Sequence, residues 1–271
     1  MRLFVAGLRK LVRRPATYVT FWLLVGLLAL ILIAVGATAG RETANGNGGQ
    51  QALALVTFPG AYTLILSFIL GLGGLFAVIY GAAIAGSEWT WGTLKSAVAR
   101  GESRSRYQLV SFAAIAIMVG LGLVLALAAG VAVAVVGAGL GGVSTAGLGD
   151  AATLGTIPEL LGRGWLAIVE EGALGFGIAT LARSQLAGIG AGIAVYFGEQ
   201  FAAIFLPDIV KYLPFNAANA VVATGGGGGF GGGGATLPRL EPDVAMVVVA
   251  AWLVGALAVS ALFTERAEIS G

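Results

Sequence analysis

The side chains best suited to chemistry in this sequence are three glutamates inside otherwise apolar runs. Glu170 and Glu171 are adjacent in "WLAIVEEGALGFGIATLARSQ", and Glu199 interrupts "AGIAVYFGEQFAAIF". Carboxyl groups in such surroundings can bind cations, exchange protons or hydrogen-bond between helices. The chain has no His and no Cys, which excludes the commonest proton-transfer group, thiolate nucleophiles and disulfides. Any acid–base or cation chemistry inside these runs therefore falls to the three glutamates.

A second polar group is the stretch 87–108, "SEWTWGTLKSAVARGESRSRYQ", which separates two long apolar runs. An aromatic belt and a basic loop would explain its tryptophans and arginines. They would not explain an acid at Glu88 or the Gly92-Thr93 pair. We therefore expect a short helix from about Ser87 to Ala99. Its polar side chains should face water and its tryptophans should lie near the interface, and the residues concerned are Glu88, Thr93, Lys95, Trp89 and Trp91.

Composition decides what must position these side chains. The 271 residues are 58% hydrophobic and 10% charged, whereas soluble domains carry about 25% charged residues. Such a chain cannot cover a water-facing surface, so it is an integral membrane protein. It contains no nucleotide-binding glycine loop, so we expect no ATP site and no enzyme activity in this chain. No basic run is interleaved with aromatics, which argues against nucleic-acid binding.

The apolar runs predict an all-α fold in one transmembrane domain, 1–271. A bilayer core needs about 20 mostly apolar residues per helix. Six segments meet this requirement, at about 17–39, 59–86, 108–137, 163–182, 186–206 and 243–263.

The distribution of Lys and Arg over alternating loops predicts the orientation. One side receives eleven basic residues: Arg2, Arg9, Lys10, Arg13, Arg14, Lys95, Arg100, Arg104, Arg106, Arg183 and Arg266. The other side receives four: Arg41, Arg163, Lys211 and Arg239. We therefore expect both termini to be cytoplasmic, in a plasma (inner) membrane.

The N-terminal segment 2–14, "RLFVAGLRKLVRR", has the pattern of an amphipathic helix. At 100° per residue its apolar side chains fall in one sector and its basic ones in the opposite sector. Such a helix lies in the headgroup region with its basic face towards anionic lipid. Pro15 then ends it and lets the chain turn into the first span. The alternative is a simple positive-inside anchor.

The segments between spans on the other side are less informative. The region 207–242 is the longest of them, and its part from Pro207 to Thr224 predicts a short amphipathic or re-entrant helix. A glycine-rich external loop, 224–236, follows and should lack regular structure, because glycine loses the most entropy on folding.

The three intramembrane acids should lie at one depth. The turn at Arg183 is tight, so the fourth and fifth spans form an antiparallel hairpin. At 1.5 Å per residue, Glu171 lies about 18 Å from Arg183. Glu199 lies about 21 Å from Gln185. Together with Glu170, the acids could serve as protonated or hydrogen-bonded packing groups, as an acidic lining of a transport path, or as a proton relay.

Small residues recur every fourth position on the fifth span. They form the patterns Gly188-xxx-Gly192 and Gly190-xxx-Ala194-xxx-Gly198. Such spacing lets helices approach closely in a membrane. We therefore predict a helix–helix seam between two copies of the chain that includes Gly188, Gly192 and Gly198.

The stretch "EWTWGTLKSAVARGESRSRY" resembles the cytoplasmic segment after the second span in permeases of the type-2 ABC exporters. Members of that family read Glu, an aromatic, then Gly-Thr and a small apolar run before an Arg. This chain matches with Glu88, Trp89, Gly92, Thr93, Leu94, Ala97, Val98 and Arg106. It departs at Arg100-Gly101, where the family often has Pro. The resemblance extends to "LRKLVRRPATY", the six spans, "TLARSQ" and "YLPFNAANAV".

The resemblance implies an ATP-driven exporter with an N-terminal elbow helix and a cytoplasmic coupling helix. Such permeases dimerise, as homodimers or with a related permease, and pair with a separate ATP-binding subunit that holds ATP and Mg²⁺. No cofactor or metal is then expected in this chain. The implied ATPase-coupling residues are Glu88, Trp89, Gly92, Thr93, Leu94 and Lys95.

Two other functions remain open at this point. One is a secondary transporter driven by ion gradients through the intramembrane acids, although such folds usually contain internal repeats and none is evident here. The other is a non-transporting scaffold that binds a cytoplasmic partner through 87–107. The substrate is not named by the sequence; the apolar interior suggests a lipophilic one.

Overall fold

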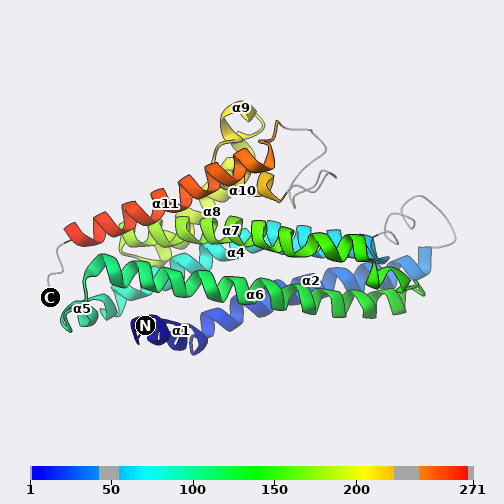
Figure 1. Cartoon of the computed structure of the whole chain (residues 1–271), viewed down its shortest axis with the longest axis horizontal. Coiled ribbons are helices and arrows are strands. Elements are labelled where there is room, and N and C mark those ends of the chain that lie inside the picture. Colours follow the sequence, from blue (N-terminus) through cyan, green and yellow to red (C-terminus); the bar gives the residue numbers. More distant parts are fainter. Residues whose placement is uncertain (1, 43–54, 223–237, 268–271) are drawn as a thin grey trace.

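A computed structural model describes residues 2–42, 55–222 and 238–267, and this part of the chain contains helices and no strand (Figure 1). The predicted glycine-rich loop, 224–236, lies outside the described residues. The helices are α1 (Arg2–Val12), α2 (Pro15–Glu42), α4 (Gly60–Thr90), α5 (Thr93–Val98), α6 (Arg104–Leu140), the 3₁₀ helix η1 (Ala146–Gly149), α7 (Ala151–Ala182), α8 (Gln185–Ala202), α9 (Pro207–Val210), α10 (Pro214–Val221) and α11 (Pro242–Arg266).

Five described helices are long and apolar enough to cross a membrane: α2, α4, α6, α7 and α11. The longest, α6, has 37 residues and therefore measures about 55 Å. That length exceeds the hydrocarbon core of about 30 Å, so α6 extends beyond the core. The prediction of an all-helical polytopic membrane protein is confirmed.

The fifth predicted span, 186–206, corresponds to α8, which does not meet the same criterion. Its 18 residues measure about 27 Å. Polar side chains at Gln185, Glu199 and Gln200 and several glycines reduce its hydropathy. In Figure 1, α8 ends before the right-hand end of the bundle that α6 and α7 reach. The short helices α9 and α10 follow it, where a short amphipathic or re-entrant helix was expected between Pro207 and Thr224.

The helix α7 begins twelve residues before the predicted span boundary at 163. Asp150 caps it, because its carboxylate accepts hydrogen bonds from the Thr153 backbone N–H (2.9 Å) and hydroxyl (2.6 Å). Pro158 lies within the helix.

The centre of the bundle is α4, which packs closely against α7. A Cβ placed at Gly81 would overlap the Gly172 carbonyl, and one at Gly175 would overlap the backbone of Val78. The backbones of the two helices therefore touch at these points, as small residues allow in membrane proteins. Gly36 of α2 makes the same kind of close approach to α6.

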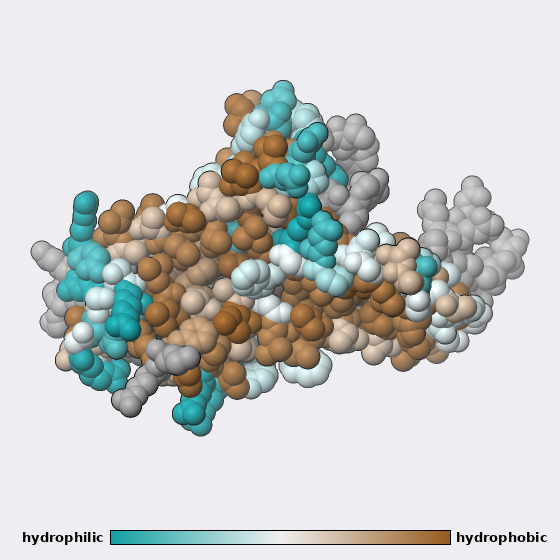
Figure 2. All heavy atoms as spheres, viewed as in Figure 1, coloured by the Kyte–Doolittle hydropathy of each residue, from teal (hydrophilic) through white to brown (hydrophobic). Residues whose placement is uncertain are grey.

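The apolar core divides along the bundle. One cluster joins α2, α4 and α6, and a second joins α1, α4, α6 and α7 near the end that carries α5. A third joins α7, α10 and α11. Figure 1 shows α1, α5 and the end of α11 in the left-hand half of the molecule. Figure 2 shows a broad apolar surface, with polar residues gathered at the left-hand end and around α9.

Candidate functional site

The polar centre of the left-hand end is Glu88, in the last turn of α4. Its side chain is 1% exposed. One carboxylate oxygen is paired with Lys10 of α1 and lies 3.6 Å from the Arg14 guanidinium. The other accepts hydrogen bonds from the hydroxyls of Thr93 and Tyr107, the latter at 2.6 Å. A single carboxylate therefore connects α1, the α1–α2 junction, α5 and α6.

Arg14 occupies the junction between α1 and α2 and is itself buried. Its guanidinium donates a hydrogen bond to the Ser87 hydroxyl at 2.5 Å. The same group lies 5.0 Å from the centre of the Trp91 ring, in cation–π geometry. The junction is also fixed by Thr17, whose hydroxyl donates to the Leu11 carbonyl at 2.8 Å.

The positive and negative groups of this network attract one another. Burial lowers the pKa of Lys10, while the adjacent Glu88 carboxylate acts in the opposite direction by favouring the protonated amine. Two cations therefore face one buried anion. They contact one oxygen of the Glu88 carboxylate, and the two hydroxyl groups donate hydrogen bonds to its other oxygen. A buried charge in this position requires such partners.

The helix predicted over Ser87–Ala99 is broken into two pieces. α4 continues to Thr90, and the separate helix α5 begins at Thr93. Gly92 between them has φ 64°, in the left-handed region that favours glycine. The break turns α5 away from α4, and Thr93 bonds back to Glu88 across it.

The expectation that Glu88 faces water is wrong, because the cations of α1 draw it inward. Leu94 is also buried, at 2% exposure, and packs inside the fold. Trp89 stacks edge-on against Phe263 of α11 and receives the Arg183 guanidinium at 5.3 Å. The side chains of this region that face outward are Trp91, Lys95, Ser96 and Arg100.

The basic residues of α1 divide between two faces. Lys10 and Arg14, one turn apart, point inward to Glu88, whereas Arg9 and Arg13 are exposed. The prediction that the basic side chains share one lipid-facing sector is therefore wrong for the first pair. Leu11 packs inward against the core, as the amphipathic pattern indicated.

The three intramembrane acids come together in the structure. Glu170 is fully buried, Glu171 and Glu199 are each 4% exposed, and the three carboxylates interact electrostatically. Glu199 accepts hydrogen bonds from the backbone N–H groups of Phe215 (3.1 Å) and Asn216 (3.2 Å). It thus caps the first turn of α10, as carboxylates do at helix N-termini.

The other carboxylate oxygens have fewer partners. Both oxygens of Glu170, one of Glu171 and one of Glu199 are buried without a hydrogen bond in the described part of the chain. A Cβ at Gly74 of α4 would overlap the Glu171 carboxylate, so this glycine provides its space. Among the described residues, no group of His, Cys, Asp or Glu is arranged to hold a metal ion.

The predicted glycine seam is used partly inside the monomer. A Cβ at Gly188 would overlap Ala179 of α7, and one at Gly192 would overlap the Val78 side chain of α4. These two glycines therefore pack α8 within its own chain. Gly198 has open space around its Cβ position and lies on the exposed face of α8.

Sequence reasoning missed Lys10, Arg14 and Tyr107 as partners of Glu88, Ser87 as a partner of Arg14, and Asn216 as a partner of Glu199. The available signal was an acid at the end of an apolar span on the side that receives most basic residues. No model of a known protein family matches the chain, and no curated protein sequence matches it.

Proposed function

We propose that this chain is the membrane-spanning permease subunit of an ATP-driven exporter of the type-2 ABC class. A separate ATP-binding subunit, which carries ATP and Mg²⁺, docks against α5. The observation that supports this most is the buried Glu88 network, which connects the short helix α5 to α1, α4 and α6 at one end of the bundle.

Coupling to a partner requires an element whose displacement must move the spans. α5 has this property, because it joins α4 through two residues and bonds to Glu88 through Thr93. Its Leu94 and Ala97 side chains are buried in the bundle. A force on its outer face is thus transmitted to several helices at once.

The proposed coupling roles divide into two groups. Lys95 and Trp91 face outward and contact the ATPase, while Gly92 provides the turn. Glu88, Trp89 and Leu94 act from inside, by holding α5 and the end of α4 in position. The ATPase therefore senses Glu88 only through the rigidity it gives to α5.

The rest of the proposal concerns assembly and substrate. α8 serves as a sixth, shorter span, which places both termini on the cytoplasmic side of the plasma membrane. Two permeases, identical or related, associate through the exposed small residues of α8: Gly190, Ala194 and Gly198. The apolar interior favours a lipophilic substrate, and the acids of α7 and α8 either line its path or pack the helices.

The test is co-purification of the chain with the ATP-binding subunit produced beside it. We expect an ATPase to co-purify with the unaltered chain and to be lost with Lys95→Glu. The matched control is Lys211→Glu, at the residue that follows α9, a charge reversal distant from α5 that should retain the ATPase. Absence of any ATPase on the unaltered chain would overturn the proposal, and equal retention by both variants would overturn docking at α5.

A second candidate is transport driven by an ion gradient, favoured by the buried carboxylate oxygens without hydrogen bonds at Glu170 and Glu171. In that case the chain alone, reconstituted in liposomes, should take up substrate in response to an ion gradient. Glu170→Gln should abolish the uptake. No uptake by the chain alone would dismiss this candidate.

A further inference from the structure

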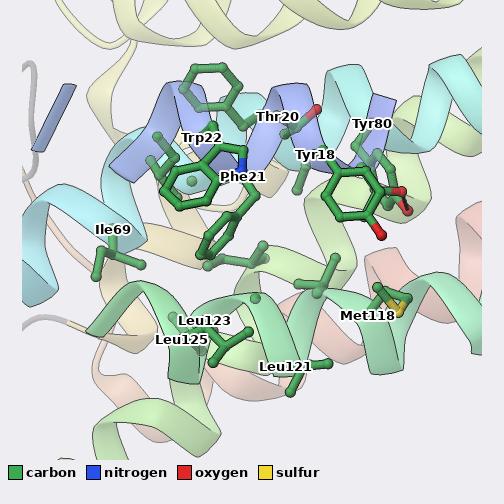
Figure 3. A pocket seen from close by; sticks show the side chains of 18 of the residues that line it. Tyr18, Thr20, Phe21, Trp22, Ile69, Tyr80, Met118, Leu121, Leu123 and Leu125 are labelled. Atoms are coloured by element: carbon green, nitrogen blue, oxygen red, sulfur yellow. Dashed lines mark hydrogen bonds between the residues drawn. The ribbon is translucent and has the colours of Figure 1, made fainter. Parts of the chain in front are cut away.

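A cavity of about 400 Å³ opens on the side of the bundle between α2, α4 and α6. Figure 3 shows Phe21 and Trp22 of α2 on one side of it and Leu121 and Leu125 of α6 on the other. Its walls are almost wholly apolar. The cavity is separate from the Glu88 network and from the three intramembrane acids.

The cavity follows the helices rather than crossing them. Its lining residues on α4 run from Ile69 to Tyr80, a rise of about 16 Å. Gly73, Phe76 and Ala77 lie between them, and the two small residues leave room along this length. An elongated apolar space of this kind fits a hydrocarbon chain lying parallel to the spans.

One end of the cavity carries hydroxyl groups. Val12 of α1 and the hydroxyl-bearing residues Thr17, Tyr18 and Tyr80 line this end, and the Thr17 and Tyr80 hydroxyls are hydrogen-bonded at 2.9 Å. The amphipathic helix α1 thus brings its C-terminus to the mouth of the cavity. Helices of this type lie at the level of lipid headgroups.

Two arginines beside this mouth remain available. Arg9 lies one turn before Val12 on the same face of α1, and Arg13 directly follows Val12. Both are exposed, and neither has an ion-pair partner within the ranges that the structure describes. Lys10 and Arg14 instead neutralise Glu88. Phosphate groups are the anions that arginine binds best at a membrane surface.

We propose that this cavity binds one acyl chain of an anionic phospholipid, whose phosphate is held by Arg9 and Arg13. The apolar walls select a hydrocarbon chain, and Arg9 and Arg13, next to the lining residue Val12 on the N-terminal segment, select a negatively charged headgroup. A neutral hydrophobic ligand would use the cavity without the arginines, and a second copy of the chain would leave them unneutralised. The inference does not depend on the proposed transport function.

The test uses the purified full chain in mixed micelles with equal amounts of phosphatidylglycerol and phosphatidylcholine that have identical acyl chains. Native mass spectrometry counts the lipids retained. We expect the unaltered chain to retain phosphatidylglycerol preferentially. Arg9→Gln and Arg13→Gln should each reduce that preference roughly fivefold, because a basic side chain near an anionic headgroup contributes about that factor.

A second variant tests the cavity itself. Gly122 lines it, and the position of a Cβ there has no atom within 4 Å, so Gly122→Leu fills the cavity without a clash. Gly26→Leu on α2 is the matched control, because its Cβ position is equally open and it does not line the cavity. We expect Gly122→Leu to lose the retained lipid and Gly26→Leu to keep it, with equal thermal unfolding temperatures.

Two results would overturn the proposal. Equal retention of lipid by Gly122→Leu and Gly26→Leu would show that the cavity is not the site. Equal binding of the two lipids by the unaltered chain would show that the arginines do not select the headgroup.

Discussion

Replacing Glu88 by glutamine tests whether its buried charge holds the left-hand end of the bundle together. The substitution keeps the size of the side chain and removes one negative charge. Lys10 and Arg14 then face each other without an anion, and their side chains are 31% and 10% exposed. Removing one partner of a buried ion pair destabilises a protein by about 3–5 kcal/mol. Because water reaches part of Lys10, we expect the lower end of this range, about 3 kcal/mol.

The measurement is reversible unfolding in micelles, followed by the fluorescence of the tryptophans near the network. A loss of about 3 kcal/mol raises the unfolding equilibrium constant on the order of 100-fold. Glu102→Gln is the matched control, because it removes the same charge from a more exposed ion pair. The Glu102 side chain is 35% exposed, that of its partner Arg106 is 66% exposed, and the two groups are 3.9 Å apart. Such a surface pair contributes about 0–1 kcal/mol.

A double-mutant cycle separates the ion pair from a general effect of the substitution. Lys10→Met and Glu88→Met should each destabilise the chain, and the double variant should be less destabilised than the sum by about 1–3 kcal/mol. If Glu88→Gln unfolds no more easily than Glu102→Gln, or if the cycle is additive, the carboxylate does not hold these helices as we argue.

Other positions give further tests. Gly92→Ala should destabilise the left-handed turn before α5 by about 1 kcal/mol, measured as faster hydrogen exchange in α5. Gly192→Leu should unfold the monomer because it overlaps an α4 side chain, whereas Gly198→Leu should keep the monomer fold and lower the dimer fraction in light scattering. Glu199→Ala should leave two N–H groups of α10 unpaired and cost about 1–3 kcal/mol, with faster exchange in α10. Hydrogen bonds from the first turn of α7 lower the pKa of Asp150. The ionised carboxylate should therefore slow hydrogen exchange in that turn fully above the ordinary Asp pKa, and this effect should be lost as pH falls through the lowered value. Asp150→Asn should remove the pH dependence.

Apolar length predicted the spanning helices well, because a run of about 20 apolar residues has few other stable conformations. Apolar length was a poorer guide to the start of α7 and to α8. The start of α7 was missed because the span was drawn from apolar length alone, whereas the helix begins at the Asp150 cap and includes Pro158. α8 was taken as a full span because the run 186–206 is about 20 residues long and mostly apolar. Its own 18 residues do not meet the criterion for crossing.

The candidate site was harder to predict because its contacts join residues that are far apart in the sequence. The pairing of Glu88 with Lys10 joins residues 78 positions apart, and no periodicity in either segment indicates it. The amphipathic pattern of α1 placed all its basic residues on one face. A helical projection shows which residues share a face, but it does not show whether their partner is an acid inside the protein or a lipid headgroup. The common depth of the three acids was predictable, because a tight turn and a constant helical rise fix it. The cap that Glu199 forms on α10 was not.

The division of the α1 cations explains how one short helix can serve two neighbouring sites. Two positions one turn apart, Lys10 and Arg14, are fixed by Glu88, and this orients the helix. The same orientation leaves Arg9 and Arg13 exposed, before and after Val12, which lines the proposed lipid cavity. If a lipid held there and a partner held at α5 each favour one position of α1, linkage requires each to change the affinity of the other by the same factor. The physical connection is short, because Thr17 bonds both to the end of α1 and to Tyr80 of α4, which is two turns before Glu88. On the two proposals together, partner binding at α5 should therefore depend on the lipid held beside α1.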